Sequence, residues 1–324
     1  MATGMTRHRV TRVRWNDGAD AATTSTREDV VAREEPLEIR IDGTSWSVTM
    51  RTPGDDFDLV AGFLVSEGVI AARDELASLR YCAGFDEFGR REENTYNVID
   101  AVLGRGAIPP RDAHARHSTT TSACGICGTT SIEAVSKQSR FDVAGDGIRV
   151  DAGILARLPE VLRQSQALFD RTGGVHAAGL FTAEGELLCL REDVGRHNAV
   201  DKIVGWAVRE DRLPLSGTVL QVSGRASFEL VQKARLAGIP VLAAVSAPSS
   251  LAVDLAAASG MTLVGFSRGS SLAIYTCPER VLVPATAAVA SGSRARPAGS
   301  QRAAIALITS TIPPTKTAGR AAST

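Results

Sequence analysis

The chain has 324 residues, of which 44% are hydrophobic and 22% are charged, and its mean hydropathy is +0.01. This length predicts about two domains, and the composition excludes a wholly disordered chain, a collagen-like chain and a small scaffold held by disulfides. The longest apolar runs, such as residues 239–245, are far shorter than the roughly 18 residues that a membrane-spanning helix needs, so we expect no membrane partner.

Charge is balanced over the whole chain but not along it. There are 36 basic and 36 acidic residues. Residues 1–27 and 284–324 together hold ten basic and two acidic residues, which leaves 26 basic and 34 acidic residues in the centre and a net charge there of −8. An acidic body is a poor match to a phosphate backbone, so we predict that nucleic acid is not a partner.

Five cysteines are spread along the chain. An odd number in a chain of this size, without an apolar leader segment, is not typical of a disulfide framework. We therefore expect reduced thiols and a cytoplasmic location. The five are Cys82, Cys124, Cys127, Cys189 and Cys277.

The first half of the chain is predicted to be mixed α+β. Residues 36–41 and 45–50 are strand-like and are joined through Asp42-Gly43, a typical hairpin turn because glycine tolerates positive φ. Apolar residues recur at helical spacing over residues 55–67, and residues 95–103 form a further strand. The first half therefore opens as a small β-β-α region.

The second half is predicted to be an α/β sheet covered by helices. A helix from Pro159 to about residue 172 precedes a hairpin, and strands and helices then follow in turn. The strands are continuously apolar, as in a sheet that is buried on both faces. The expected strands are residues 175–181, 187–190, 218–222, 239–245, 261–266 and 272–276, and the expected helices cover residues 200–207, 226–236 and 248–258.

These elements predict four regions. Residues 1–28 are a flexible basic extension, and residues 29–150 are a β-rich subdomain that carries a cysteine loop. Residues 151–283 are the α/β subdomain, where we expect a cofactor to bind. Residues 284–324, rich in Ala, Ser, Thr, Pro and Arg, are a disordered tail.

The segment Cys124-Gly125-Ile126-Cys127-Gly128 holds two thiols at a spacing that lets them exchange a disulfide or bind one side of a metal. A helix predicted over residues 131–138 follows them. A zinc site would need His114 and His117, since there is no second cysteine pair; a thioredoxin-like centre would need another order of elements. A reactive thiol on a loop and an inert buried pair are the other interpretations. Placement on a loop favours a reactive thiol, and we predict no metal.

Three segments that follow predicted strands suit an anion. Residues 194–197, 223–225 and 267–271 place glycine, hydroxyl or arginine where backbone N–H groups can hold phosphate, although each is also a common turn sequence. The chain has no phosphate-binding loop of the P-loop type and no glycine-rich dinucleotide motif. His197 suits hydrogen bonding, proton handling or a helix cap, whereas His176, in a predicted strand, is expected to be a packed or hydrogen-bonded residue and not a catalyst.

Six segments are distinctive when they are read together. They are Glu34-Glu35-Pro36-Leu37-Glu38-Ile39, Thr52-Pro53-Gly54-Asp55-Asp56, Gly62-Phe63-Leu64-Val65-Ser66-Glu67-Gly68, the Cys124 loop, Gly174-Val175-His176-Ala177-Ala178 and Glu192-Asp193-Val194-Gly195-Arg196-His197-Asn198. In this order, from about residue 29 to about residue 283, they resemble the FdhD family of formate dehydrogenase accessory sulfurtransferases.

The resemblance implies a sulfur carrier that takes a persulfide sulfur from a cysteine desulfurase. It would deliver this sulfur to the molybdenum or tungsten bis(molybdopterin guanine dinucleotide) cofactor before the cofactor enters formate dehydrogenase. By this resemblance Cys124 holds the persulfide and Cys127 assists, and the family suggests a homodimer. The residues implied to bind the cofactor are Phe266, Ser267, Arg268, Gly269, Ser270 and Ser271.

The family also implies a cytidine-deaminase-like, three-layer sheet in the second half. The deaminase motifs are absent, since the chain has Arg196-His197-Asn198 and Ser223-Gly224-Arg225 in place of His-x-Glu and Pro-Cys-x-x-Cys. The scaffold would then serve binding. The alternative hypothesis is a non-catalytic chaperone that holds and delivers the guanine dinucleotide cofactor through the three strand-end segments.

Overall fold

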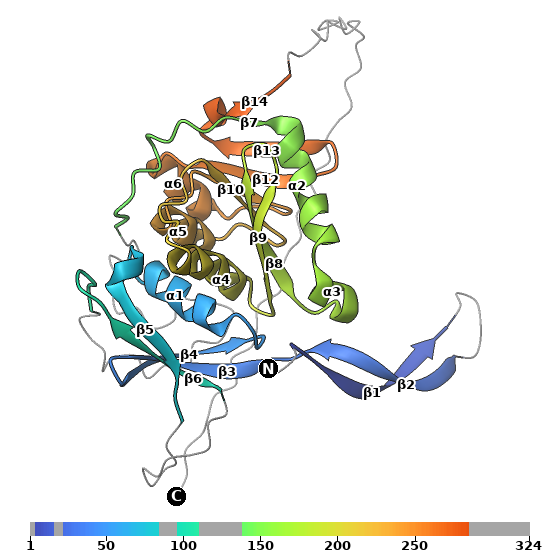
Figure 1. The fold of residues 1–324 in the computed structure, drawn as a ribbon. Helices are drawn as coiled ribbons and strands as arrows, with labels where there is room; N and C mark the ends of the chain where they lie inside the picture. The colour runs from blue at the N-terminus through green and yellow to red at the C-terminus, as the bar shows by residue number, and fades with distance from the viewer. Residues whose placement is uncertain (1–3, 16–21, 84–95, 110–137, 285–324) are drawn as a thin grey trace, which may run out of the picture. The chain divides into compact units, whose positions relative to one another are not determined.

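The computed structural model describes residues 4–15, 22–83, 96–109 and 138–284. These residues belong to one compact unit, which runs from Met1 to Pro284. Two main sheets account for most of its strands (Figure 1). None of the helices described in these ranges is long and apolar enough to cross a membrane.

The first sheet has four strands in the order β4-β3-β6-β5. Strand β3 pairs antiparallel with β4 and parallel with β6, and β5 closes the sheet antiparallel to β6. The predicted hairpin is confirmed, with Asp42 and Gly43 at φ 48° and 81°, the left-handed region that a tight two-residue turn requires. The bounds are β3 Glu35–Ile41, β4 Thr44–Arg51, β5 Leu76–Tyr81 and β6 Val98–Leu103, with α1 at Asp56–Ser66.

The second sheet has six strands in the order β13-β12-β11-β10-β8-β9. Strands β10, β11 and β12 are parallel, β8 is antiparallel to both of its neighbours, and β13 is antiparallel to β12. The predicted order of strands and helices along the chain is confirmed. The bounds are β8 His176–Thr182, β9 Leu187–Asp193, β10 Thr218–Val222, β11 Val241–Ala244, β12 Thr262–Arg268 and β13 Ser271–Thr276.

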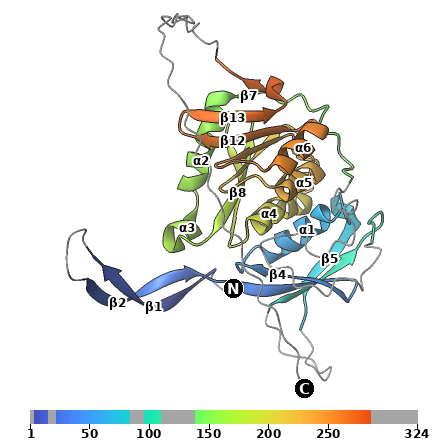
Figure 2. The same cartoon turned by 180° about the vertical axis from the view of Figure 1, so that it is seen from behind.

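Helices cover both faces of this sheet and make it three-layered, as the predicted α/β class requires. Figures 1 and 2 show α4, α5 and α6 on one face and α2 and α3 on the other. Side chains of β10 alternate between the two faces of the sheet, and both faces are apolar: Leu220 and Val222 pack into one apolar cluster, and Val219 packs into the other. Both faces therefore need a layer of helices. The bounds are α2 Ala152–Gln164, α3 Ala167–Thr172, α4 Arg196–Arg209, α5 Phe228–Leu236 and α6 Ser250–Ala258.

Helix α2 begins earlier than the sequence predicted. Its N-cap is Asp151, whose carboxylate accepts hydrogen bonds from the backbone N–H groups of Gly153 and Ile154 at 2.7 and 3.2 Å. Pro159 therefore lies inside the helix and not in its first turn. The missing N–H of Pro159 leaves the carbonyl of Leu155 without its helical partner.

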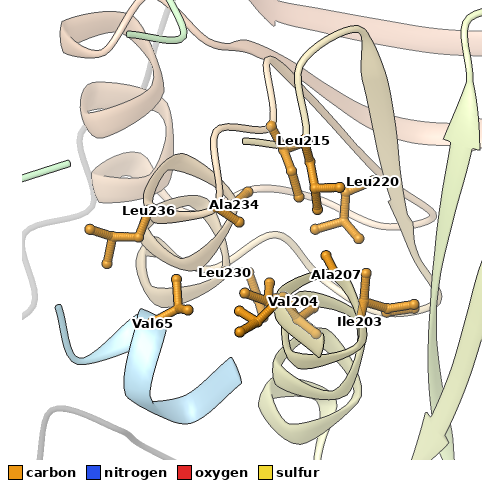
Figure 3. Close-up of a cluster of buried hydrophobic side chains, with 14 of the residues drawn as sticks. Val65, Ile203, Val204, Ala207, Leu215, Leu220, Leu230, Ala234 and Leu236 are labelled. Atoms are coloured by element: carbon orange, nitrogen blue, oxygen red, sulfur yellow. The ribbon is translucent and has the colours of Figure 1, made fainter. Parts of the chain in front are cut away.

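Helices α1 and α4 cross at two glycines. A Cβ atom on Gly62 would lie 1.8 Å from the carbonyl oxygen of Asp201, and one on Gly205 would lie 1.7 Å from that of Asp58. The two backbones are therefore in direct contact. Figure 3 shows Val65 of α1 in one apolar cluster with residues of α4 and α5. This crossing joins the first sheet to the second.

Residues 5–14 and 23–32 form a two-stranded sheet, although the sequence analysis expected a flexible extension over residues 1–28. Strands β1 (Met5–Arg14) and β2 (Thr23–Ala32) pair antiparallel in register. Their Thr and Val residues favour extended backbone, whereas the charged residues between them are typical of a solvated segment and led to the wrong expectation.

A second short pair of strands, β7 (Val150–Asp151) and β14 (Val281–Leu282), is parallel. The helix predicted at residues 131–138 and the tail predicted at residues 284–324 lie outside the described residues, except for their end residues 138 and 284.

Candidate functional site

Four strand ends meet at one edge of the six-stranded sheet. Strands β9, β10, β11 and β12 run in the same direction, so their carboxyl ends lie together, and the start of antiparallel β8 lies beside them. Ligands of open α/β sheets bind at such an edge, where the strand order changes direction. The three strand-end segments predicted to suit an anion all leave this edge.

Backbone hydrogen bonds fasten the strand-end segments to one another. The N–H of Ser246 donates to the carbonyl of Gly224 at 3.4 Å, and the N–H of Phe266 donates to the carbonyl of Ser246 at 3.3 Å. The N–H of Ser249 likewise donates to Ala226 at 3.0 Å. The segments after β10, β11 and β12 therefore form one continuous surface and not three separate turns.

The segment Phe266–Ser271, predicted to bind cofactor, forms the end of β12, its turn and the start of β13. Phe266 has φ 51°, is 38% exposed and lies under the Arg268 guanidinium, whose Cζ is 5.8 Å from the ring centroid. Gly269 has φ 61°, which a turn with this backbone shape requires. Phe266, Arg268 and the residues that follow to Ser271 are exposed and available to a ligand.

Ser267, a member of the predicted set, lies on the inner side of the same segment. It is 0% exposed, and its hydroxyl donates to the carbonyl of Leu155 at 2.6 Å. That carbonyl is the one that Pro159 leaves without a helical partner. Ser267 thus fastens the segment to α2, while its neighbours Phe266 and Arg268 face solvent.

Asp193 is the centre of the polar network at the start of α4. Its buried carboxylate lies 2.8 Å from the Nζ of Lys202 and accepts hydrogen bonds from the backbone N–H groups of Thr52 and Gly195 at 3.1 and 2.8 Å. Asn198 donates to the same carboxylate at 3.0 Å. The network holds the end of β4 against the start of α4.

Two further residues of this motif fix neighbouring elements. The carboxylate of Glu192 accepts from the backbone N–H groups of Leu168 and Phe169 at 2.8 and 2.9 Å, which stabilises the start of α3. The side-chain amide of Asn198 also donates to the carbonyl of Met50 at 2.7 Å. The motif at residues 192–198 therefore acts mainly as a structural junction.

His197 makes hydrogen bonds, as its sequence position suggested. Its Nε2 lies 2.7 Å from the Oε2 of Glu229 and 3.4 Å from the hydroxyl of Ser227, both at the start of α5. Burial opposes ionisation of Glu229, but the hydrogen bond from His197 and nearby positive charges outweigh it, so the pKa of Glu229 is lowered. Among the described residues, no group of three or more His, Cys, Asp or Glu side chains is arranged to hold a metal.

A pocket of about 530 Å³ opens between α2, α3 and the edge of the sheet. Ser223 and His176 line it at the strand ends, and Phe169 and Arg163 line it on the helical side. Ser223 is held in place because its hydroxyl accepts from the N–H of Ala177 at 2.9 Å. The volume suits a ligand of small-molecule size.

His176 occupies the first position of β8 and is only partly buried, so it is available to the pocket. Burial and the neighbouring Arg196 and His197 lower the pKa of His176, and Asp193 opposes them. The imidazole is therefore neutral at pH 7 and can either donate or accept a hydrogen bond. The sequence analysis favoured a packed residue, and the structure adds that it faces a pocket.

Cys124 and Cys127, the predicted sulfur-handling pair, lie outside the described residues. Of the remaining cysteines, Cys189 is buried in the apolar core, whereas Cys82 and Cys277 are partly exposed. Burial raises the pKa of Cys189 to about 11, so it is a protonated and unreactive thiol at neutral pH.

A family profile described as FdhD/NarQ matches residues 32–282. The chain belongs to the FdhD/NarQ family. Two curated relatives are both named sulfur carrier protein FdhD. The one from Streptomyces avermitilis is 56% identical over 283 residues, covering 87% of this chain and 97% of the relative. The one from Nocardia farcinica is 57% identical over 255 residues, covering 79% and 89%.

A solved structure has a similar fold. The crystal structure of a candidate formate dehydrogenase accessory protein from Desulfotalea psychrophila aligns with a TM-score of 0.63 and 25% identity. The alignment covers 85% of this chain and 99% of that one. The family assigned by the sequence resemblance is therefore confirmed both by relatives and by fold.

Sequence reasoning missed two residues of the polar network around Asp193. Lys202 lies among apolar residues of α4 and is 1% exposed; a lysine on the buried face of a predicted helix was a usable signal, because such a charge needs a partner. Thr52 belongs to one of the six distinctive segments, but nothing in the sequence indicated its partner, because Asp193 is 141 residues away in the sequence.

Proposed function

We propose that this chain is a sulfur carrier that serves formate dehydrogenase and works by persulfide transfer. Membership of the FdhD/NarQ family, with relatives named sulfur carrier protein over nearly their whole lengths, carries this proposal. The proposed partners are a cysteine desulfurase, formate dehydrogenase and a second copy of the chain. The proposed acceptor is the molybdenum bis(molybdopterin guanine dinucleotide) cofactor.

Sulfur loading is a thiol exchange in this proposal. The thiolate of Cys124 attacks the outer sulfur of the desulfurase persulfide, a new S–S bond forms on Cys124, and the desulfurase thiolate leaves. No oxidant is required because the outer sulfur keeps its oxidation state. A persulfide ionises more readily than a thiol, so Cys124 would then present a charged sulfur to the acceptor.

The cofactor that accepts the sulfur would bind at the exposed edge of the six-stranded sheet. Phe266, Arg268 and Gly269 are exposed or in a turn, and hydrogen bonds link their segment to the loops after β10 and β11. An aromatic ring with a guanidinium beside it can bind both a planar base and a phosphate. These features support Phe266–Ser271 as the cofactor segment, in which Ser267 has a positioning role.

The decisive experiment is intact-mass measurement of the reduced chain after incubation with a cysteine desulfurase and cysteine. We expect a gain of about 32 mass units, one sulfur, in the wild type and in Cys127→Ser, and no gain in Cys124→Ser. Cys82→Ser is the matched control, because Cys82 is a partly exposed thiol outside the motif.

No sulfur gain in the wild type, with an active desulfurase, would overturn the persulfide proposal and favour the cofactor chaperone. In a strain that lacks the native gene, formate dehydrogenase activity should then survive Cys124→Ser but not Arg268→Ala. Persulfide transfer predicts instead that Cys124→Ser abolishes the activity.

A further inference from the structure

Strands β1 and β2 form a two-stranded ribbon that is joined to the rest of the protein at the end that contains Ala32. Helix α3 lies against β2 there, and the N–H of Arg33 donates to the carbonyl of Gly4 at 2.9 Å. Farther along the ribbon, residues 11–15 and 22–28 are all exposed, and Figures 1 and 2 both show this part away from the two main sheets. A two-stranded ribbon exposed on both faces is only marginally stable in water, so a partner that covers it would stabilise it.

Both long edges of the ribbon are free in the part of the chain that the structure describes. Strands β1 and β2 pair with each other along their whole lengths and with no other described strand. The backbone N–H and C=O groups along each outer edge can therefore pair with a further strand. Strand addition of this kind is a recurring way in which one protein binds an extended segment of another.

The side chains near the far end of β1 differ between the two faces of the ribbon. Because side chains alternate along extended backbone, Arg12 and Arg14 lie on one face, whereas Val13 and Trp15 lie on the other. Val13 and Trp15 are 46% and 69% exposed. Exposed tryptophan close to arginine is typical of protein-binding surfaces, where both residue types are enriched.

The positive charges of Arg12 and Arg14 have no counter-charge among the described residues. The residues directly opposite them on β2 are uncharged, namely Ser25 and Thr23. The two acidic residues of β2 pair with other arginines, Glu28 with Arg7 at 3.5 Å and Asp29 with Arg27 at 3.3 Å. Successive side chains on one face of a strand are about 7 Å apart, so carboxylates at alternate positions of a neighbouring strand would match the two arginines.

These charges also decide which occupant fits the free edge of β1. Two copies of β1 placed edge to edge would bring arginines together, and like charges opposite one another destabilise a pair of strands. A lipid surface offers no backbone groups to pair with the edge. The occupant that fits is therefore a polypeptide segment with acidic side chains on one face and apolar side chains on the other.

We propose that β1 binds an extended segment of a partner protein in which acidic and apolar residues alternate. The segment would add to the free edge of β1, with its carboxylates beside Arg12 and Arg14 and its apolar side chains beside Val13 and Trp15. The inference goes beyond the proposed function, because it concerns recognition of a partner and not transfer of sulfur. Except for Ala32, the ribbon lies outside the residues that the family profile matches.

The test is fluorescence anisotropy with the full chain and a labelled ten-residue peptide in which Glu and Val alternate. We expect saturable binding, which Arg12→Glu combined with Arg14→Glu should weaken by at least about 10-fold because attraction becomes repulsion. A peptide with Gln in place of Glu should lose a similar factor on the wild type. Trp15→Ala should weaken binding by about 5-fold or more.

Two N-methylated peptides distinguish strand addition from attraction between charges alone. One carries N-methyl groups on its Glu residues and the other on its Val residues, so each has lost the backbone donors of one edge and keeps those of the other. We expect one of these peptides to bind the wild type like the unmodified peptide and the other to lose binding. Equal binding of both would overturn strand addition.

The matched control is Arg105→Glu combined with Arg157→Glu, which changes the net charge by the same amount at two exposed arginines outside the ribbon. This variant should bind the peptide like the wild type, and equal weakening in the two double variants would overturn the inference. Light scattering and sedimentation with phosphatidylglycerol vesicles test the other occupants. An oligomer that dissociates in the Arg12 and Arg14 variant, or vesicle binding without peptide binding, would assign the ribbon to a second copy or to a membrane and overturn the proposal.

Discussion

Lys202 carries a positive charge into the interior of the protein. Its side chain is 2% exposed and its Nζ lies 2.8 Å from the Oδ2 of Asp193, whose side chain is fully buried. The carbonyl of Thr52 accepts a further hydrogen bond from the same Nζ at 2.9 Å. Because removal of one partner leaves a buried charge without compensation, we predict that Lys202→Met lowers the free energy of unfolding by about 3–5 kcal/mol.

Urea denaturation followed by circular dichroism measures this change. The control is Arg7→Gln, since Arg7 pairs with Glu28 at 3.5 Å and both side chains are more than 70% exposed, and it should unfold like the wild type. The double variant Lys202→Met with Asp193→Asn should recover part of the loss, because it removes the uncompensated charge. Wild-type stability of Lys202→Met would show that the pair has no such role.

At the scale of single residues, the sequence predicted the chemical role of a side chain better than it predicted the residue that the side chain contacts. The hydrogen-bonding role of His197 followed from its local position and is confirmed. The partner of His197 did not follow, because Glu229 begins a helix 32 residues later. Arg196 looked like part of an ordinary turn, and only the structure shows that its Nε is buried without a hydrogen-bond partner among the described residues.

The crossing of α1 and α4 depends on two glycines. A methyl group on Gly62 would meet the carbonyl of Asp201 at 1.8 Å, and neither backbone can yield without separating the helices. We predict that Gly62→Ala lowers the free energy of unfolding by about 3 kcal/mol or more, the upper range for overpacking. Thermal denaturation measures it. Gly147→Ala is the control, since a Cβ there meets nothing within 4 Å.

At the scale of elements, the strands of the second half were predictable. Apolar runs bounded by turn residues located them, and residues 218–222 coincide with β10. The start of α2 was not predictable from the sequence. Pro159 is a stronger helix-start signal than Asp151, whose capping contacts are visible only in the structure. The pairing of β1 with β2 was also missed, since charged residues between Thr and Val masked the strand pattern.

One apolar cluster spans both halves of the molecule. It contains Leu37 of β3 and Leu64 of α1 together with Val204 of α4 and Leu230 of α5, and Figure 3 shows the part around Val65. Polar contacts accompany it: Asp58 of α1 pairs with Arg191 and Arg209, and Ser66 donates to Asp201 at 2.6 Å. The predicted boundary at residue 150 therefore divides the sequence without dividing this core.

The consequence is that residues 151–284 should not fold stably alone. Without α1, the apolar surface of α4 and the buried carboxylate of Asp201 lose much of their cover, since Lys233 is then the only described side chain that pairs with Asp201. We predict that this fragment shows no cooperative thermal transition and binds a hydrophobic dye, and that co-expression with residues 29–150 restores the cooperative transition and abolishes dye binding. The control is the chain of residues 1–284, which keeps the whole core. A fragment of residues 151–284 with a sharp transition would show instead that the six-stranded sheet is an independent folding unit to which the first half is docked.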